Sequence, residues 1–380
     1  MLKVIELFSG IGAQREALKR ANIPHEVVGI SEIDPYAIKT YRFLHGWTPN
    51  YGDIAKIKEL PQADLWTYSF PCTDISLSGN LQGFSKDSGT RSSLLWEVQR
   101  LLEVSKEKGT LPRFLLLENV KNIISKRFMP LFQEWIDYLS SLGYKSFYQV
   151  LNSKNYGVPQ NRERCFMISI LNYDGDFNFP NPFELETTLQ DLLEDKVDAK
   201  YFLSEKMVRY ITSNNEKWTG NNRESIINRS IASTITTGEG SKRCDASNYV
   251  SKEFPVDFDL KKYLFVNENT KLGYAVAEAG DGIYINRPHQ KRGTVQKSMV
   301  PTIKASPDIG VVVNEKDALG VRRLTPRECW RLMGWNDERI DRAFEAGCSE
   351  TQYYKMAGNS IVVNVLVEVF KALKNCINIT

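Results

Sequence analysis

The sequence has few of the residues that build zinc sites and disulfide frameworks. Its 380 residues include six cysteines and three histidines, and no two cysteines form a C-x-x-C pair. Structural zinc sites need closely spaced ligands of this kind, and small secreted proteins need a denser set of cysteines. The sequence therefore predicts no metal ion and a reducing compartment, so a cytoplasmic location is expected.

Long apolar runs and a strong net charge are also absent. No apolar run reaches the ~18 residues of a membrane span, and residues 1–8 are too short, and too acidic at Glu6, for a signal peptide. We therefore expect no membrane association. The formal net charge is only +3, so any surface that binds nucleic acid must be local.

Short apolar segments alternate with helical stretches through the first part of the chain. The pattern predicts strands at 4–8, 27–30, 65–70, 114–117 and 164–171, and helices at 13–21, 35–43, 91–106 and 128–142. Such a βαβα order is typical of an α/β fold with a doubly wound, mostly parallel sheet.

The alternation stops near residue 172. Residues 178–320 are rich in Asn, Asp, Ser and Thr and predict a smaller, loop-rich domain inserted into the α/β domain. A helix is then expected from Thr325, because Thr325 and Glu328 form a capping box and Pro326 suits the first turn. A last helix is expected at 361–373.

Glycines and acids follow the first two predicted strands, at the edge where open α/β sheets bind ligands. Gly10 and Gly12 lie in a strand-to-helix turn, where a ligand can approach free helix N–H groups. Glu32, 20 residues after Gly12, suits a ribose diol, and Asp53 suits an adenine amino group. Since the turn matches neither G-x-G-x-x-G nor a P-loop, S-adenosylmethionine fits better than NAD, and Phe8 could stack on its adenine. A tight turn without a ligand is the alternative.

A cysteine and a glutamate follow two further strands. Pro71 ends one strand and places Cys72 at its carboxyl end, and Glu118 follows three buried leucines, where burial favours its protonated form. A thiolate that adds to C6 of cytosine, while an acid protonates N3, makes C5 nucleophilic enough to take a methyl group. Arg162 and Arg164 could supply the positive potential that ionises the thiol. Alternatively, Cys72 is a small core residue and Glu118 an exposed strand end.

Taken in order, these motifs resemble the DNA cytosine-5 methyltransferase family over roughly 1–171 and 321–375. The resemblance is carried by Phe8-Ser9-Gly10-Ile11-Gly12, Glu32, Asp53, Phe70-Pro71-Cys72, Glu118-Asn119-Val120, Gln160-x-Arg162-x-Arg164 and Gly358-Asn359-Ser360. It implies a Rossmann-like S-adenosylmethionine-dependent fold, divided into a catalytic domain (1–177), a target-recognition domain (178–320) and a return to the catalytic domain (321–380).

The resemblance also implies roles for single residues. Cys72 falls at the nucleophile, and Glu118 and Arg164 fall at cytosine-binding positions, with Arg162 supporting. Two departures stand out, since Thr73 replaces the family's usual glutamine and Glu6 its more common aspartate. The positions that bind S-adenosylmethionine, and the product S-adenosylhomocysteine, are Phe8, Ser9, Gly10, Gly12, Glu32, Ile33, Asp53, Ile54, Pro71, Leu94, Asn359 and Ser360.

Contacts to DNA are expected from two segments. The Ser- and Gly-rich stretch 73–93 predicts a mobile lid over the DNA. The stretch between Asp281 and Asp308 is basic and contains no acid, which suits phosphate contact. The candidate residues are Ser76, Ser78, Lys86, Arg91, Arg287, Lys291, Arg292, Lys297 and Lys304.

The resemblance implies site-specific methylation of double-stranded DNA by a monomer, in a bacterial cell or a phage-infected host. Whether a cognate restriction endonuclease acts as a functional, not a physical, partner is left open. Two alternatives are a tRNA cytosine methyltransferase of the same fold and a catalytically silent DNA-binding relative. The insert of about 140 residues argues against the first, and intact Cys72, Glu118 and Arg164 argue against the second.

Overall fold

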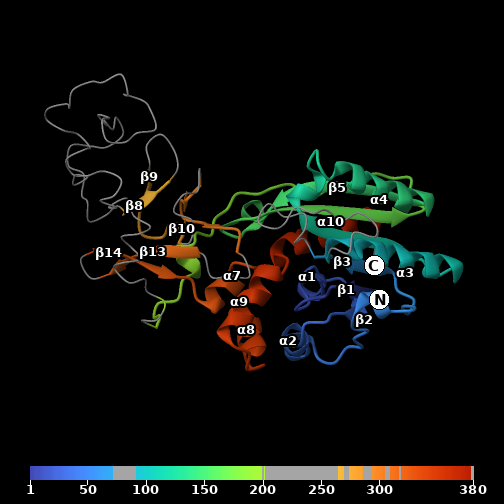
Figure 1. Ribbon diagram of the computed structural model, residues 1–380, viewed down its shortest axis with the longest axis horizontal. Helices are drawn as coiled ribbons and strands as arrows, with labels where there is room; N and C mark the ends of the chain where they lie inside the picture. Colours follow the sequence, from blue (N-terminus) through green and yellow to red (C-terminus); the bar gives the residue numbers. More distant parts are fainter. Residues whose placement is uncertain are drawn as a thin grey trace, which may run out of the picture. The chain divides into compact units, whose positions relative to one another are not determined.

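The computed structural model describes residues 1–71, 91–198, 201, 264–268, 274–285, 293–303, 309–315 and 318–377. The chain forms two compact units (Figure 1). The larger unit comprises Met1–Thr187, Lys304–Ser306 and Cys329–Thr380, and the smaller comprises Thr188–Ile303 and Pro307–Glu328. The smaller unit thus begins and ends later along the chain than the 178–320 insert expected from the sequence.

A six-stranded sheet in the order β2-β1-β3-β4-β7-β5 forms the centre of the larger unit (Figure 1). Strands β1, β2, β3 and β4 are parallel, and β7 runs antiparallel between β4 and β5. The predicted α/β sheet of mostly parallel strands is confirmed, but β5 was not predicted. The strands are β1 (Leu2–Leu7), β2 (His25–Ser31), β3 (Leu65–Tyr68), β4 (Phe114–Val120), β5 (Tyr144–Asn152) and β7 (Glu163–Leu171); the short β6 (Gln160–Asn161) precedes β7.

Helices cover both faces of this sheet. Side chains alternate along β1, β3 and β4, and one set, including Leu7, Trp66 and Leu117, packs in a core with α3 (Leu95–Glu107) and α4 (Met129–Ser141). The alternate set, including Glu6, faces α1 (Ala13–Arg20), which packs against α10 (Val363–Ile377). The remaining helices are α2 (Pro35–His45), α7 (Pro326–Arg331), α8 (Asp337–Phe344) and α9 (Glu350–Asn359), with single turns η1 (Ile54–Lys56), η2 (Arg91–Leu94), η3 (Lys121–Ile124) and η4 (Ser153–Tyr156).

The smaller unit is built from short strands. Four of them form an antiparallel sheet in the order β11-β10-β13-β14, and two others pair with each other. The predicted helix start is confirmed, because the Thr325 N–H donates to Glu328 Oε2 (2.8 Å) and the Glu328 N–H donates to Thr325 Oγ1 (3.2 Å). The elements are η5 (Gln190–Leu192), β8 (Leu264–Asn267), β9 (Tyr274–Ala277), β10 (Gly282–Tyr284), β11 (Val295–Gln296), β12 (Val300–Pro301), β13 (Ile309–Glu315) and β14 (Ala318–Arg323).

Within the part of the chain that the structure describes, one stretch, Glu350–Asn375, is long and apolar enough to cross a membrane by length and composition. It comprises α9 and most of α10, and 56% of its most apolar window is buried inside the fold. Core helices pass the same test, so this stretch is weak evidence for a membrane span.

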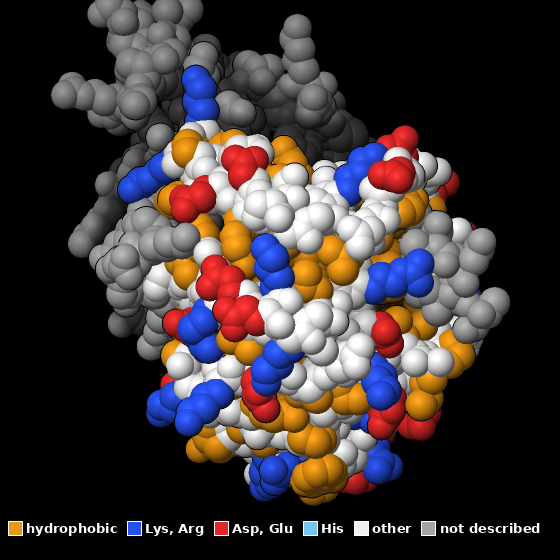
Figure 2. Space-filling model, turned by 90° about the vertical axis from the view of Figure 1, so that its right-hand side faces the viewer, with side chains coloured by type: hydrophobic (Ala, Val, Ile, Leu, Met, Phe, Trp, Pro, Cys, Tyr) orange, Lys and Arg blue, Asp and Glu red, His pale blue; other side chains and the backbone are white. Residues whose placement is uncertain are grey.

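The face of the molecule in Figure 2 carries basic and acidic side chains side by side, with apolar ones between them. This mixture agrees with the small net charge of +3. Binding along many successive phosphates needs a broad area of positive charge. The described residues on this face do not form such an area.

Candidate active site

The turn after β1 has a backbone that runs through three left-handed residues. Phe8, Gly10 and Gly12 have φ of 56°, 55° and 78°. A side chain on Gly12 would lie 2.6 Å from both His45 and Tyr41, whereas a Cβ on Gly10 would meet nothing within 4 Å. The turn is therefore tightly packed against His45 and Tyr41 at Gly12, whereas the space next to Gly10 is open.

The buried hydroxyl of Ser9 points to what this turn could hold. Ser9 is 3% exposed, and its Oγ has no hydrogen-bond partner among the described residues. Buried hydroxyl groups are normally paired, so an unpaired one beside open space suits a polar ligand. The turn therefore fits a nucleoside-bearing group such as the one predicted from the sequence.

Glu32 ties the end of β2 to the same turn. Its Oε2 accepts the Gly10 N–H at 2.8 Å, and its Oε1 accepts the N–H groups of Ile33 and Asp34 at 2.9 and 2.8 Å. Each carboxylate oxygen can accept two hydrogen bonds, so Oε2 keeps a free direction for a ligand hydroxyl. The side chain of Ile33 is 71% exposed beside it.

The other predicted cofactor residues lie on neighbouring elements. Asp53 precedes η1, and its Oδ1 accepts the Ala55 N–H at 3.1 Å, while Ile54 is buried in the core. Leu94 is half-buried against that core, and Pro71 is half-buried at the end of the described segment 1–71. At the end of α9, Asn359 is exposed and Ser360 is buried.

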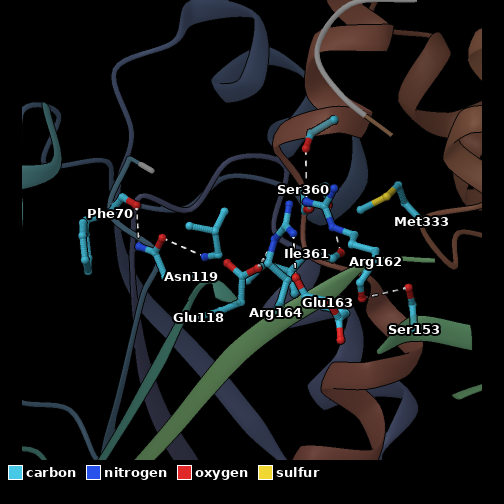
Figure 3. Close-up of polar contacts among 12 residues, drawn as sticks. Phe70, Glu118, Asn119, Ser153, Arg162, Glu163, Arg164, Met333, Ser360 and Ile361 are labelled. Carbon is cyan, nitrogen blue, oxygen red and sulfur yellow. Dashed lines mark hydrogen bonds and ion pairs between the residues drawn. The ribbon is translucent and has the colours of Figure 1, made fainter. Parts of the chain in front are cut away.

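Glu118 and Arg164 form the most distinctive pair of the site. Val120 of β4 lies opposite Arg164 of β7, so Glu118 and Arg164 are diagonal neighbours on one face. Arg164 Nε lies 3.3 Å from Glu118 Oε1, and the two side chains are 17% and 9% exposed (Figure 3). Burial raises the pKa of Glu118, and the charges of Arg164 and Arg162 and a hydrogen bond with Ser69 oppose that rise. Burial in this setting therefore favours the protonated form of the Glu118 carboxyl group.

Two further side chains hold the strand ends around this pair (Figure 3). The Asn119 side-chain amide donates to the Phe70 carbonyl at 3.1 Å, which fixes the backbone immediately before Pro71. Arg162 donates to the carbonyls of Gly358 and Ser360 at 3.2 and 2.9 Å. The segments that precede residue 72 and follow α9 are thus anchored to the strands that carry Glu118 and Arg164.

A second cysteine lies next to the pair but cannot act as a nucleophile. Cys165 is fully buried on β7, and burial, followed by the charge of Glu118, raises the pKa of its thiol to about 12. The thiolate is the reactive form, and at neutral pH this thiol stays protonated.

Cys72 and most of the residues predicted to contact DNA lie outside the described residues. Two of the predicted DNA contacts, Lys297 and Arg91, lie within them. Lys297 is described, and its ammonium pairs with Asp281 at 2.8 Å and with Glu278 at 3.0 Å. For Arg91 the structure gives the backbone in η2 but not the side chain. The residues outside the described part are Cys72, Ser76, Ser78, Lys86, Arg287, Lys291, Arg292 and Lys304, together with most of the 73–93 lid.

Sequence reasoning assigned no role to Asn119 or to the surroundings of Glu6. Asn119 lies in a motif already noted, and its position at the end of a buried strand was a usable signal. Glu6 is fully buried and accepts from the Arg15 N–H and the Tyr41 hydroxyl, contacts that join residues up to 35 positions apart. No local pattern predicts such contacts.

Comparisons with known proteins cover nearly the whole chain. The model of a family described as C-5 cytosine-specific DNA methylase matches residues 2–375. The type II methyltransferase M2.ScrFI of Lactococcus lactis subsp. cremoris is 34% identical, over 98% of this chain and 99% of the relative. The orphan methyltransferase M.SPRI of Bacillus phage SPR is 32% identical, over 98% of this chain and 97% of the relative.

Two solved structures share the architecture. The S. pombe Dnmt2 methyltransferase has a TM-score of 0.60 at 20% identity, and the match covers 100% of both chains. The Entamoeba histolytica methyltransferase EhMeth has a TM-score of 0.60 at 16% identity, over 99% of this chain and 98% of that one. At these identities the likeness concerns the fold.

Gly12 offers a test of the turn. Replacement by alanine forces a left-handed residue to carry a side chain, which costs about 1–2 kcal/mol, and also drives Cβ against His45 and Tyr41. Gly10→Ala carries the first cost without the second. We expect Gly12→Ala to lower the free energy of unfolding in urea by at least ~1 kcal/mol more than Gly10→Ala. Equal losses would show that the packing behind Gly12 does not constrain the turn.

Proposed function

The chain belongs to the family of C-5 cytosine-specific DNA methylases, and we propose that Cys72, Glu118 and Arg164 perform its chemistry. It is a DNA cytosine-5 methyltransferase with the fold of S-adenosylmethionine-dependent methyltransferases. The observation that carries the proposed roles is the buried Glu118–Arg164 pair, held beside the backbone that leads into Cys72.

The proposed mechanism starts from the weak nucleophilicity of cytosine C5. The Cys72 thiolate bonds to C6 while Glu118 gives its proton to N3, so the ring becomes an enamine with electron density at C5. S-adenosylmethionine, when bound, supplies an electrophilic methyl group for that carbon. A base then removes the C5 proton, the sulfur–C6 bond breaks, and N3 returns its proton to Glu118.

The environment of Glu118 suits both halves of this cycle. Burial raises its pKa and so favours the protonated form that the first step needs, and Arg164 stabilises the carboxylate once the proton has left. The Arg164 guanidinium can also donate to the ring's C2 carbonyl. Arg162 is a supporting residue, since it binds the carbonyls of Gly358 and Ser360.

We propose that the Phe8–Gly12 turn, Glu32 and Asp53 bind S-adenosylmethionine, whose product is S-adenosylhomocysteine. The buried Ser9 hydroxyl, the open space at Gly10 and the free direction at Glu32 support this assignment. Ile33, Ile54, Pro71, Leu94, Asn359 and Ser360 are proposed to line the same pocket. The chemistry described needs no metal ion.

The smaller unit is proposed to recognise the target sequence in double-stranded DNA. The target base must leave the duplex, at a cost of a few kcal/mol, and contacts made elsewhere must offset that cost. The basic stretch between Asp281 and Asp308 remains the candidate for phosphate contacts. Within it Lys297 already has two acidic partners, so we expect it to contribute less than its neighbours in the sequence.

The relatives suggest where the enzyme acts. One relative is named a type II methyltransferase and another an orphan methyltransferase of a phage. We therefore propose that this enzyme acts either together with a cognate restriction endonuclease or independently of one. We propose a monomer that works in the cytoplasm of a bacterial cell or a phage-infected host.

Glu118→Gln tests the acid. The variant keeps the shape of the side chain but cannot give a proton, so we expect methyl transfer to duplex DNA to fall by about 10²–10⁴-fold with cofactor affinity unchanged. The matched control is Glu163→Gln, which removes an exposed neighbouring acid that pairs with Lys121. If labelled methyl transfer survives in the Glu118 variant, the proposed role is wrong.

Cys72→Ala should abolish turnover and leave S-adenosylmethionine binding intact in calorimetry. The physical reason is that the sulfur acts only on the base, whereas the polar contacts proposed for the cofactor come from the Phe8–Gly12 turn, Glu32 and Asp53. Cys165→Ala is the control, because its thiol stays protonated and should be dispensable. Loss of cofactor binding in the Cys72 variant would contradict this division of labour.

Exchange of residues 178–320 with those of another family member should move the methylated site. Bisulfite sequencing of plasmid from cells that express each protein measures base, context and activity together. An unchanged methylation pattern after the exchange would contradict the proposed role of the insert.

A further inference from the structure

We propose that Glu6 is a positioning residue for cofactor binding: its buried carboxylate fixes the start of α1 and thereby the shape of the Phe8–Gly12 turn. This inference rests on the proposed function of the turn as the site of S-adenosylmethionine. It assigns to Glu6, Tyr41 and Arg15 a role behind the pocket, without contact to the cofactor.

The first step of the argument is a missing helix cap. The first N–H groups of a helix need acceptors from outside it, and the residue before the helix usually supplies one. Gly12 occupies that position in α1 and has no side chain, and the space beside it is filled by Tyr41 and His45. Glu6 Oε1 instead accepts the Arg15 N–H at 2.8 Å. A carboxylate is also the group that the positive end of a helix dipole favours.

The second step is the orientation of that carboxylate. Its other oxygen, Oε2, accepts the Tyr41 hydroxyl of α2 at 2.6 Å. Arg15 closes the cluster, because its guanidinium donates to Thr48 Oγ1 at 2.9 Å and to the Tyr41 hydroxyl at 3.5 Å. β1, α1 and α2 therefore meet at one fully buried acid, and Arg15 joins the segment after α2 to them.

The third step connects the cluster to the turn from behind. His45 Nε2 lies 3.1 Å from the Ile11 carbonyl, which requires a proton on Nε2. His45 Nδ1 is then the acceptor for Arg339, at 3.3 Å. Glu6 thus fixes the start of α1, and His45 fixes the Ile11 carbonyl within the turn.

Glu6 is the member of this cluster whose charge can change near neutral pH. Burial raises the pKa of Glu6 to about 7, against the opposing effects of Tyr41 and Arg15. Burial and then the Glu6 charge raise the pKa of Tyr41, and burial with the nearby arginines lowers that of His45. Tyr41 and His45 therefore both stay neutral near pH 7.

The described elements packed around Glu6 bring apolar, hydroxyl and ion-paired side chains toward it. On β2 and β3 its cross-strand neighbours are Ile30 and Thr67. His25 of β2 has a lowered pKa through burial. Glu16 of α1 is committed to ion pairs with Arg20 and Arg339.

The two protonation states of Glu6 differ in what they can hold. The ionised form accepts from the Arg15 N–H and from Tyr41 at once, as in the structure. The protonated form is neutral and has one acceptor position fewer, so it accepts the two hydrogen bonds less strongly. We therefore expect the ionised form to bind the cofactor more tightly.

The sign of the effect differs between binding and stability. In the unfolded chain Glu6 has its ordinary pKa of 4.5, and in the fold its pKa is about 7. The folded protein then holds the extra proton between these values, so the contribution of Glu6 to stability falls as pH rises from 4.5 to 7. Cofactor affinity should rise through the upper part of the same range.

The test is calorimetry of S-adenosylhomocysteine binding to the purified protein at pH 6, 7 and 8. This ligand lacks the sulfonium charge, and its ammonium and carboxylate groups cancel, so it has no net charge that would attract the acid. We expect the dissociation constant to be about fivefold larger at pH 6 than at pH 8, as for a group whose pKa falls by about one unit on binding.

Three variants complete the experiment. Glu6→Gln fixes a neutral side chain and should bind at every pH as the wild type does at pH 6. Tyr41→Phe removes a hydrogen bond that lowers the pKa of Glu6, so the midpoint should move to higher pH. Glu16→Gln removes another buried acid of the same region and should keep the fivefold change.

The outcomes separate the inference from the function on which it rests. Absence of binding by the wild type at every pH would contradict the proposed cofactor site. Wild-type binding that does not change between pH 6 and 8, or a change that persists in Glu6→Gln, would contradict the role of Glu6 alone.

Discussion

A carboxyl group buried next to a guanidinium, at the end of a buried strand, is the constraint around which this site is organised. An isolated carboxylate in such a place is costly, so it must be paired or hold its proton. Both conditions apply to Glu118. Burial favours its protonated form, and the Arg164 guanidinium stabilises the negative charge that forms when the proton leaves. A fold that provides both conditions provides a general acid.

The topology of the sheet makes this pairing possible. A strand parallel to β4 would begin at the opposite edge of the sheet, whereas antiparallel β7 brings its first residues to the end of β4. The neighbouring segments are then fixed by single contacts of side chain to backbone. Asn119 holds Phe70, Arg162 holds Gly358 and Ser360, and Glu32 holds Gly10. The loops of the site are thus positioned by the ends of rigid strands.

The sequence predicted the elements whose signals are local. Apolar strands, the glycine turn and the capping box at Thr325 lie where periodicity and turn chemistry predict them. It missed β5, whose alternating polar residues give no apolar run. It also gave no direction for β7, because side-chain alternation is the same in parallel and antiparallel strands. The role of Glu6 could not be predicted, because its partners Arg15 and Tyr41 lie 9 and 35 positions away and no local pattern connects them. Cys72 and most of the predicted DNA contacts lie outside the described residues, and their roles stay predictions.

The central claim is that one sulfur atom bonds to a cytosine ring held by Glu118. The direct measurement uses a DNA duplex with 5-fluorocytosine at the methylated position, since fluorine at C5 cannot leave as a proton and the covalent complex persists. After digestion, mass spectrometry should locate the DNA adduct on the peptide that contains Cys72 and should find little adduct when glutamine replaces Glu118. An adduct on another cysteine, or none under conditions in which an ordinary duplex is methylated, would contradict the account.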